Sequence, residues 1–220
     1  MPAIGVLTSI PHRRHNLPIL TTGTSMNIFV LSRDIQECAK MHCDRHVVKM
    51  ITEHTQMLST AKRTFDGIPT SIKVGSKTKK INLLPGEELE VLNGELVVHN
   101  KQAFLQCHDN HPCTLWTKLC DQNYNFLVGL TRELITEYEY RYEKHHATTD
   151  TFEKLVIAPK NIKKHTHITT FAQAMPEQYK TPGDPVTGYR KYYNGEKHFA
   201  TWKNREIPFW YCTGAQHDPR

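Results

Sequence analysis

Hydrophobic and polar residues alternate along residues 41–58 with the period of an α-helix. Winding this stretch at about 100° per residue gathers apolar side chains on one face. These side chains are Cys43, Val47, Met50, Ile51, His54, Met57 and Leu58. The opposite face holds a polar stripe roughly 80° wide, made of His42, His46, Lys49, Glu53 and Gln56. The pattern predicts a helix buried on one side, unless Asp44 caps a new helix and breaks the register before His46.

The chemistry of the polar stripe is unusual for a solvated helix face. Its imidazole, amine, carboxylate and carboxamide groups are those used in proton transfer and nucleophilic attack. Glu53 lies one helical turn after Lys49. Such a spacing fits an ordinary ion pair worth about 0.2–0.5 kcal/mol. It equally fits an amine that attacks a sugar C1′ beside a carboxylate that handles protons and stabilises positive charge. The stripe therefore predicts either an active-site helix or a polar surface.

A divalent-metal site is an alternative for the same stripe. His42 and His46 are four residues apart, a spacing that suits zinc on a helix. The H-E-x-x-H motif is absent, because Cys43 stands where that motif has its glutamate. A metal site would need a third ligand, such as His108, His111 or Glu53.

The segments around this helix give weaker signals. Residues 27–31 are apolar enough for a short buried strand or extended segment, and Ser32 or Asp34 would cap a helix after them. Residues 88–98 alternate in polarity and turn at Asn93-Gly94, which predicts a β-hairpin. Together with a basic loop that includes residues 77–80, this hairpin makes residues 66–105 an insertion between helices.

A long core helix is predicted to begin near Pro112 or Thr114. Apolar side chains keep a helical spacing through Trp116, Cys120, Tyr124, Leu127, Leu130, Leu134 and Tyr138. Asn110-His111-Pro112 is typical of a helix start, with proline in the first turn. The same residues could instead contact a phosphate at the helix N-terminus. Arg141 is either a buried hydrogen-bonding node or a phosphate clamp.

Aromatic and basic residues are interleaved from residue 189 to residue 211, after a loop-rich stretch that begins near Pro159. Such a tract offers rings for stacking on bases and cations for neutralising phosphates. The alternative is a small aromatic core with basic, solvated edges.

Composition narrows the class of protein. A chain of 220 residues with 38% hydrophobic residues supports one mainly α domain, a compact helical domain with an inserted β-hairpin. A net charge of +6 favours a polyanionic partner. The 6 cysteines form no CxxC pair, and neither a secretory signal nor a membrane-spanning run is visible. We therefore expect a cytoplasmic monomer with reduced thiols. Residues 1–25 are predicted to be a disordered leader or an upstream-start extension, with Met26 as a natural start and residues 26–220 as the domain.

The motifs resemble those of the pyrimidine-dimer DNA glycosylases, the endonuclease V group, and more closely a set of uncharacterised phage proteins. Asp44-x-His46 followed by Glu53 is similar to the D-x-H…E helix of that group. Asn110-His111-Pro112 with Trp116 is similar to its N-H-P…W segment, and residues 189–195 resemble its aromatic tail. The similarity covers about half of the chain and leaves the hairpin region unmatched.

The resemblance implies a small, all-helical DNA-repair enzyme that flips a base, cleaves the glycosidic bond and nicks the strand by β-elimination. It makes Glu53 the catalytic carboxylate. The group's nucleophile is the terminal amine exposed after methionine removal, but here Asn27 follows Met26 and is too large for ready removal. Thr52 and Gln56 replace arginines of the group. Lys49 is then the candidate amine, or water is the nucleophile.

Three classes of function remain open. The first is a glycosylase, possessing or lacking lyase activity, that needs no cofactor and acts on double-stranded DNA with damaged or modified bases. In it Glu53 and Lys49 carry the reaction, while His42 and His46 move protons or contact phosphate. The second is a metal-dependent nuclease or phosphohydrolase, and the third is a non-enzymatic DNA-binding protein. The expected DNA contacts are Arg45, Gln56, Asn110, His111, Trp116, Arg141, Tyr142, Tyr189, Arg190, Lys191, Tyr192, Tyr193, Trp202, Lys203 and Arg205.

Overall fold

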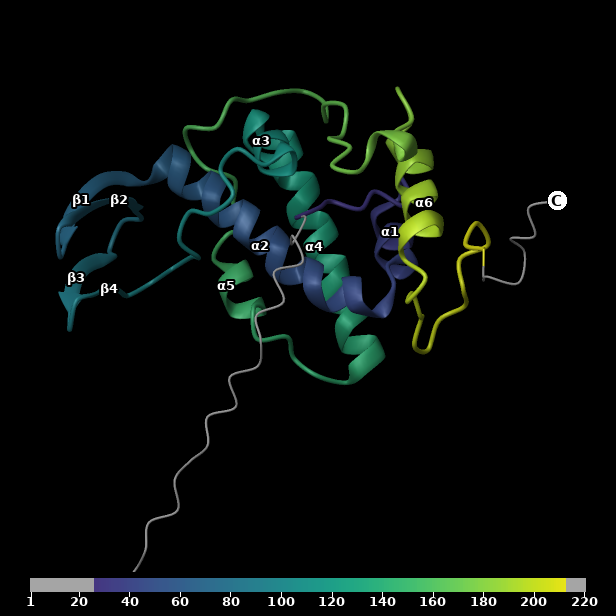
Figure 1. Cartoon of the computed structure of the whole chain (residues 1–220), viewed down its shortest axis with the longest axis horizontal. Coiled ribbons are helices and arrows are strands. Elements are labelled where there is room, and N and C mark those ends of the chain that lie inside the picture. Colours follow the sequence, from purple (N-terminus) through teal and green to yellow (C-terminus); the bar gives the residue numbers. More distant parts are fainter. Residues whose placement is uncertain (1–25, 213–220) are drawn as a thin grey trace, which may run out of the picture.

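Two long helices, α2 (Asp44–Asp66) and α4 (Asp121–Tyr142), pack against each other at the centre of the molecule (Figure 1). The computed structural model describes residues 26–212. Shorter helices surround the central pair, namely α1 (Ile35–Met41), α3 (Pro112–Leu119), α5 (Thr149–Glu153), the 3₁₀ helix Glu177–Tyr179 and α6 (Pro185–Glu196). The described residues therefore form a substantially helical fold with two small antiparallel sheets.

The extended segment 27–31 threads the core beside α1, as its apolar sequence predicted. Val30 and Leu31 are fully buried. Among the described residues the segment pairs with no strand, and side chains hold it in place instead. The Asn27 amide donates to the Ala174 carbonyl at 2.8 Å, and its oxygen accepts from the Tyr189 hydroxyl at 2.7 Å.

Residues 41–58 do not form one continuous helix: the break before His46, left open as the alternative, occurs, although Cys43 and not Asp44 is the N-cap residue. Asp34 caps α1, as predicted, by accepting from the Glu37 N–H at 2.8 Å. That helix ends at Met41, His42 has extended backbone angles, and α2 begins at Asp44. Asp44 accepts from the Thr201 hydroxyl at 2.8 Å and from the Lys203 N–H at 2.9 Å. These tertiary bonds fix the chain at the break, and they remove His42 from the polar stripe.

The predicted helix from residue 112 to residue 138 is likewise two helices, separated at Cys120. Its apolar positions are correctly predicted, because Trp116, Tyr124 and Leu127 are buried. Cys120 is extended, with φ of −163°. The Asp121 carboxylate that follows accepts from the His165 N–H at 2.9 Å. The break therefore lets the start of α4 hold the loop after α5.

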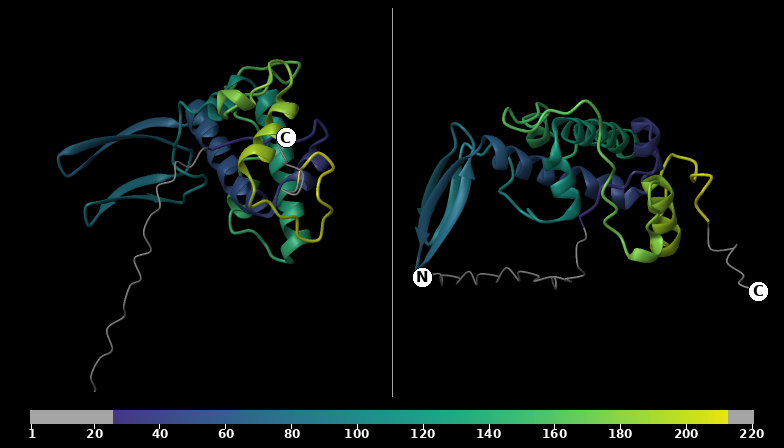
Figure 2. Two further views of the ribbon diagram at one scale, coloured as in Figure 1. Left: turned by 45° about the vertical axis from the view of Figure 1, so that its right-hand side comes forward. Right: turned by 90° about the horizontal axis from the view of Figure 1, so that it is seen from above.

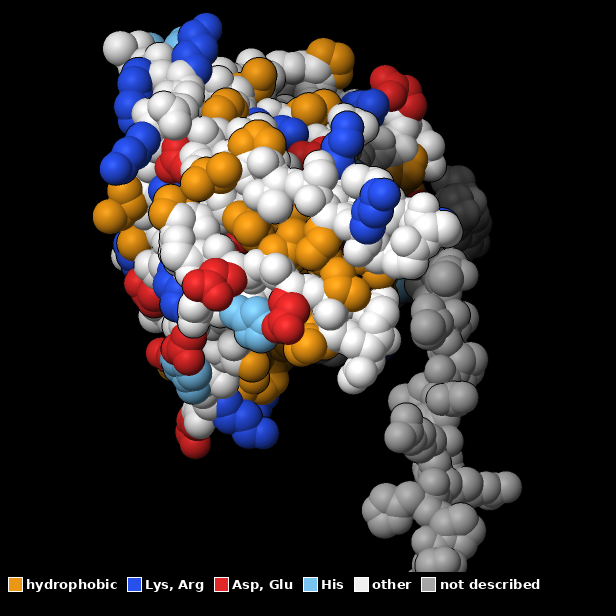
Figure 3. All heavy atoms as spheres, turned by 90° about the vertical axis from the view of Figure 1, so that its left-hand side faces the viewer, with side chains coloured by type: hydrophobic (Ala, Val, Ile, Leu, Met, Phe, Trp, Pro, Cys, Tyr) orange, Lys and Arg blue, Asp and Glu red, His pale blue; other side chains and the backbone are white. Residues whose placement is uncertain are grey.

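The insertion contains two hairpins, where one was predicted. β3 (Glu88–Leu92) and β4 (Glu95–His99) confirm the predicted hairpin, and Asn93 and Gly94 have the positive φ angles of a type I′ turn. The predicted basic loop is instead a second hairpin, β1 (Ile68–Val74) with β2 (Lys77–Leu83). The two hairpins project side by side from the C-terminal end of α2 (Figures 1 and 2). Figure 3 faces this end, where hydrophobic side chains gather near the centre and charged side chains surround them.

Two further expectations concern the state of the cysteines and the presence of a membrane-spanning helix. All six cysteines are free thiols. Within residues 26–212, no helix has the length and apolar character needed to cross a membrane. The predicted leader, residues 1–25, lies outside the described residues.

Candidate active site around Glu53

A hollow of about 510 Å³ opens over the N-terminal half of α2. Its α2 residues are those of the predicted polar stripe and their neighbours, and the other wall comes from three distant parts of the chain. The lining consists of Met26, Val48, Lys49, Thr52, Glu53, Gln56, His108 and His146. The helical period therefore places Lys49, Glu53 and Gln56 together, and tertiary packing encloses them.

Glu53 is the buried acid of this hollow. Its side chain is 8% exposed, and Oε1 lies 2.9 Å from the Lys49 ammonium. Oε2 is buried and has no hydrogen-bond partner among the described residues. Burial raises the pKa of Glu53 above its ordinary value, while Lys49 and the backbone of Asn27 oppose that shift. A carboxyl with a raised pKa and one unused oxygen is suited to giving and taking a proton.

Lys49 sits at the rim of the hollow, with a side chain that is 44% exposed. Its ammonium is therefore open to solvent on one side and bound to Glu53 on the other. Arg45, one turn earlier on α2, is also exposed, and its guanidinium lies 4.5 Å from the centre of the Phe199 ring. A basic edge thus leads along α2 to the Glu53 carboxylate.

His146 and His108 complete the wall, and neither was predicted as a catalytic residue. His108 was weighed only as a third metal ligand. The Nδ1 atom of His146 accepts from the Thr148 N–H at 3.2 Å, and burial lowers the pKa of its ring. The neutral ring therefore carries its proton on Nε2. Thr148 lies 3.1 Å from Thr52 (Oγ1 to Oγ1), which fastens this loop to α2. No local sequence signal links His146 to Glu53, because the two are far apart along the chain.

His42 and His46 do not line the hollow, and their predicted roles in proton transfer or phosphate contact are wrong for this fold. The His42 ring is fully buried and donates from Nδ1 to the Cys38 carbonyl at 2.7 Å. Burial lowers its pKa to about 4. His46 stacks on Phe29, with 4.4 Å between ring centres, and its Nδ1 lies 2.5 Å from the Tyr193 hydroxyl. Burial lowers the pKa of His46 to about 2, so both rings are neutral near pH 7.

The metal alternative lacks ligands in the part of the chain that the structure describes. No group of three histidine, cysteine, aspartate or glutamate side chains there is arranged to hold a metal ion. The Nδ1 atoms of His42 and His46 already have protein partners. His108, one of the proposed third ligands, lines the Glu53 hollow instead.

The aromatic tract is a packed core with basic edges, which is the second of its two predicted forms. Four of its rings lie inside the protein, because α6 and the chain after it cover Phe29 and α1, whereas Phe199 and Phe209 are exposed. The Trp202 indole, for example, donates to the Met41 carbonyl at 3.0 Å. The predicted DNA contacts by these rings are therefore wrong in this fold. The residues concerned are Tyr189, Tyr192, Tyr193, Trp202 and, from α3, Trp116.

Several other predicted phosphate contacts bind protein groups, although Arg205 and Tyr142 are only half-buried. Arg141 is fully buried and binds Glu137 at 2.6 Å and Asp44 at 2.9 Å, so it is the hydrogen-bonding node and not a phosphate clamp. Arg205 pairs with the same Glu137 at 2.9 Å. Tyr142 donates to the backbone of Asp44 at 3.4 Å.

His111 confirms the helix-start interpretation, because its Nδ1 accepts from the Cys113 N–H at 3.2 Å and caps α3. Arg190 is half-buried and donates to the Leu31 carbonyl at 2.9 Å. The predicted contacts that remain at the surface or at the hollow are Arg45, Gln56, Asn110, Lys191 and Lys203.

Comparison of the chain with protein-family models, with curated proteins and with solved structures gives no match. What can be inferred about function therefore comes from the Glu53 hollow and from the sequence motifs that surround it.

Proposed function

We propose that this protein is a DNA glycosylase that removes damaged or modified bases, with Glu53 as its catalytic carboxyl. One observation carries the proposal: Glu53 is buried in an open hollow, is paired on one oxygen with Lys49, and has no partner for the other oxygen among residues 26–212. Structural carboxylates are normally paired more completely. The D-x-H…E spacing in the sequence supports the same assignment.

The chemistry follows from the position of this carboxyl. When the bond between C1′ and the base breaks, positive charge develops on the sugar, and an adjacent carboxylate stabilises it. The base leaves with the bonding electrons and takes a proton, and a nucleophile forms the new bond to C1′. With water as nucleophile, Glu53 accepts its proton and an abasic site results. With an amine, an imine forms and strand cleavage by β-elimination can follow.

Both candidate amines lie at the same hollow. Lys49 lines it from α2, and Met26 lines it from the opposite wall. The backbone of Asn27 is close enough to Glu53 to lower the pKa of that carboxyl. An α-amine at residue 26 or 27 would therefore stand beside Glu53, as the Lys49 ammonium does.

The size of the hollow is compatible with a nucleobase. Its volume of about 510 Å³ falls within the range of about 300–1,000 Å³ that is common for ligand pockets. A base reaches such a pocket only after rotation out of the duplex. The proposed enzyme is a mainly α, monomeric domain that works on double-stranded DNA in the cytoplasm, needs no cofactor and does not engage a membrane.

The first experiment incubates the protein with UV-irradiated supercoiled plasmid in the presence of EDTA and measures abasic sites and relaxation. The wild type should form abasic sites, whereas Glu53→Gln should not. Glu177→Gln is a matched control, because the Glu177 carboxylate is exposed and pairs with Lys180 on the surface. Relaxation that occurs only when a divalent metal replaces the EDTA would favour the nuclease alternative. If none of a panel of damaged or modified DNAs loses a base, the proposal is wrong.

Borohydride trapping then identifies the nucleophile. If Lys49 forms the imine, a covalent adduct with damaged DNA should appear and Lys49→Ala should abolish it. If a terminal amine reacts, a chain that starts at Asn27 should form the adduct with or without Lys49, and acetylation of its terminus should prevent it. Base release without any adduct assigns the attack to water.

A further inference from the structure

The β1–β2 hairpin carries a concentrated positive charge that no acidic side chain of the described residues pairs with. Its lysines are Lys73, Lys77, Lys79 and Lys80, and it contains no acidic residue. All four side chains are exposed. In the part of the chain that the structure describes, none of them forms a salt bridge, although lysines elsewhere pair with acidic neighbours.

The hairpin has two different faces. Residues directly paired in an antiparallel ladder lie on the same face. Thr70, Ile72 and Val74 alternate along β1 and are half-buried. Lys77 and Lys79 pair with Val74 and Ile72 and share their face, whereas Lys73 and Lys80 lie on the other face. The neighbouring β3–β4 hairpin carries Glu88, Glu90 and Glu95 and has no lysine. The positive charge is therefore confined to one hairpin and is not a general feature of the insertion.

A buried ion pair fixes this hairpin to the helix that bears Glu53. Arg63, near the end of α2, is fully buried and binds both carboxylate oxygens of Glu87, at 2.6 and 2.7 Å. The same guanidinium donates to the carbonyls of Asn82, at the end of β2, and Ala103, after β4. Because these bonds meet at one rigid side chain, the direction of the hairpins is set relative to α2.

The hairpins project to the side on which the hollow lies. Seen from above, the hairpins and α6 extend to the same side of the α2–α4 layer, and the described chain begins between them (Figure 2, right). That beginning, Met26, lines the Glu53 hollow. A long partner lying on this side would meet both the hollow and the hairpin.

The distance from Glu53 to the hairpin matches a length of DNA. Ten residues of helix from Glu53 to Arg63 span roughly 15 Å, and a seven-residue strand spans roughly 23 Å. The tip of the hairpin is thus roughly 27–38 Å from Glu53 for directions between perpendicular and collinear. Duplex DNA rises about 3.4 Å per base pair, so this reach covers roughly 8–11 base pairs, about one turn.

We propose that the β1–β2 hairpin is a DNA-binding arm that contacts the phosphate backbone about one helical turn from the base held at Glu53. The inference rests on the proposed action on DNA, but not on the chemistry at C1′. Its partner is duplex DNA, because exposed lysines on both faces of a projecting β-ribbon, with no acidic residue among them, suit the phosphates of a DNA backbone. The arm supplies affinity and orientation, and Glu53 supplies the reaction.

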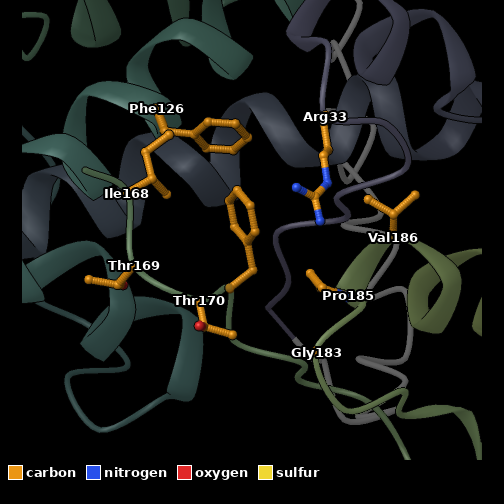
Figure 4. A pocket seen from close by; sticks show the side chains of 9 residues that line it. Arg33, Phe126, Ile168, Thr169, Thr170, Gly183, Pro185 and Val186 are labelled. Carbon is orange, nitrogen blue, oxygen red and sulfur yellow. The ribbon is translucent and has the colours of Figure 1, made fainter.

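Other hollows on the surface give weaker arguments. The hollow of about 360 Å³ between α4, α6 and the loop after α5 is lined by Phe126, Ile168 and Pro185, and the Arg33 guanidinium points into it (Figure 4). Arg33 is exposed, and no described feature of that hollow selects one ligand. The basic arm, by contrast, has a defined charge, anchor and reach.

The test measures binding to duplexes of about 10 and about 30 base pairs, each with one abasic site at its centre to fix it at the hollow, at several salt concentrations. The arm variant is Lys77→Gln, Lys79→Gln, Lys80→Gln. The control variant is Lys154→Gln, Lys160→Gln, Lys163→Gln, which makes the same change in charge at exposed lysines outside the hairpins. Circular dichroism and thermal unfolding establish that both variants are folded.

The arm variant should bind the long duplex about 10- to 100-fold more weakly at low salt. The slope of log K against the logarithm of the salt concentration should become shallower by up to about 2.7, or about 0.9 for each lost phosphate contact. Centred on the hollow, the short duplex does not reach the arm, so the variant should lose little affinity for it. If the arm and control variants lose the same affinity, or if the arm variant loses the same affinity for both duplexes, the proposal of a DNA-binding arm is wrong. Absence of DNA binding by the wild type would also overturn it. If the arm variant loses DNA binding but the wild type cleaves no glycosidic bond, the proposed glycosylase activity is wrong and the DNA-binding arm stands.

Discussion

Two buried glutamates attached to the same helix have opposite environments. Glu53 lies in the first half of α2, while Glu87 lies between the hairpins and binds Arg63 in the last turn. Each has a basic partner, at 2.9 Å for Glu53 and at 2.6 Å for Glu87. Glu87 also accepts from the backbone N–H groups of Leu84 and Gln102. Its two oxygens are therefore saturated, whereas one buried oxygen of Glu53 has no partner in the part of the chain that the structure describes.

The difference separates a structural carboxylate from a reactive one. The Arg63 guanidinium and the backbone N–H groups lower the pKa of Glu87 although burial opposes them. For Glu53 burial dominates, and the pKa rises. A saturated carboxylate has no capacity left for a substrate, because every lone pair already has a donor. An incompletely paired carboxylate in an open hollow retains that capacity at some cost to stability.

The largest expected effect concerns activity. Glu53→Gln should reduce the rate of base release by about a thousandfold or more, because the amide cannot exchange a proton or stabilise positive charge. Binding to damaged DNA should survive, and the melting temperature should stay within a few degrees of the wild type. Single-turnover kinetics and calorimetry measure the two effects. A variant that unfolds, or that keeps near-normal activity, would refute the contrast with Glu87.

The next effect concerns stability. Arg63→Ala should lower the free energy of unfolding by about 3–5 kcal/mol, because it leaves the Glu87 carboxylate buried without its ion-pair partner. Chemical denaturation measures the loss. Arg132→Ala is the matched control, since the Arg132–Glu153 pair is exposed and 4.0 Å long and should contribute about 0–1 kcal/mol. If both variants lose the same stability, Glu87 is not the structural member of the comparison.

The smallest expected effect is on the pH dependence of the free energy of unfolding, whose sign should differ between the two glutamates. The pKa of Glu53 is raised in the folded protein, so its ionised form opposes folding. The wild type should therefore lose stability relative to Glu53→Gln as pH rises above 4.5, the ordinary pKa of a glutamate. The folded pKa of Glu87 is lowered. Relative to Glu87→Gln, its contribution is therefore complete above 4.5 and is lost as pH falls through the folded pKa. Unfolding experiments from pH 3 to pH 7 should give slopes of opposite sign for the two pairs.

The sequence by itself determined which residues share a helix face or a turn. The helical period placed Lys49, Glu53 and Gln56 together, and the structure encloses all three in one hollow. The Asp34 cap and the Asn93-Gly94 turn were equally readable, because capping and type I′ turns depend on residues a few positions apart.

Only the tertiary structure decided which of these faces are covered. His46 belongs to the same polar stripe as Glu53, yet packing against Phe29 and Tyr193 buries it. Arg63 gave no signal of its bond to Glu87, and the wall formed by His146 comes from a loop far along the chain. Periodicity fixes the direction of a side chain relative to its own helix. Burial, and with it the pKa and the unused oxygen of Glu53, depends on segments that meet only when the chain folds.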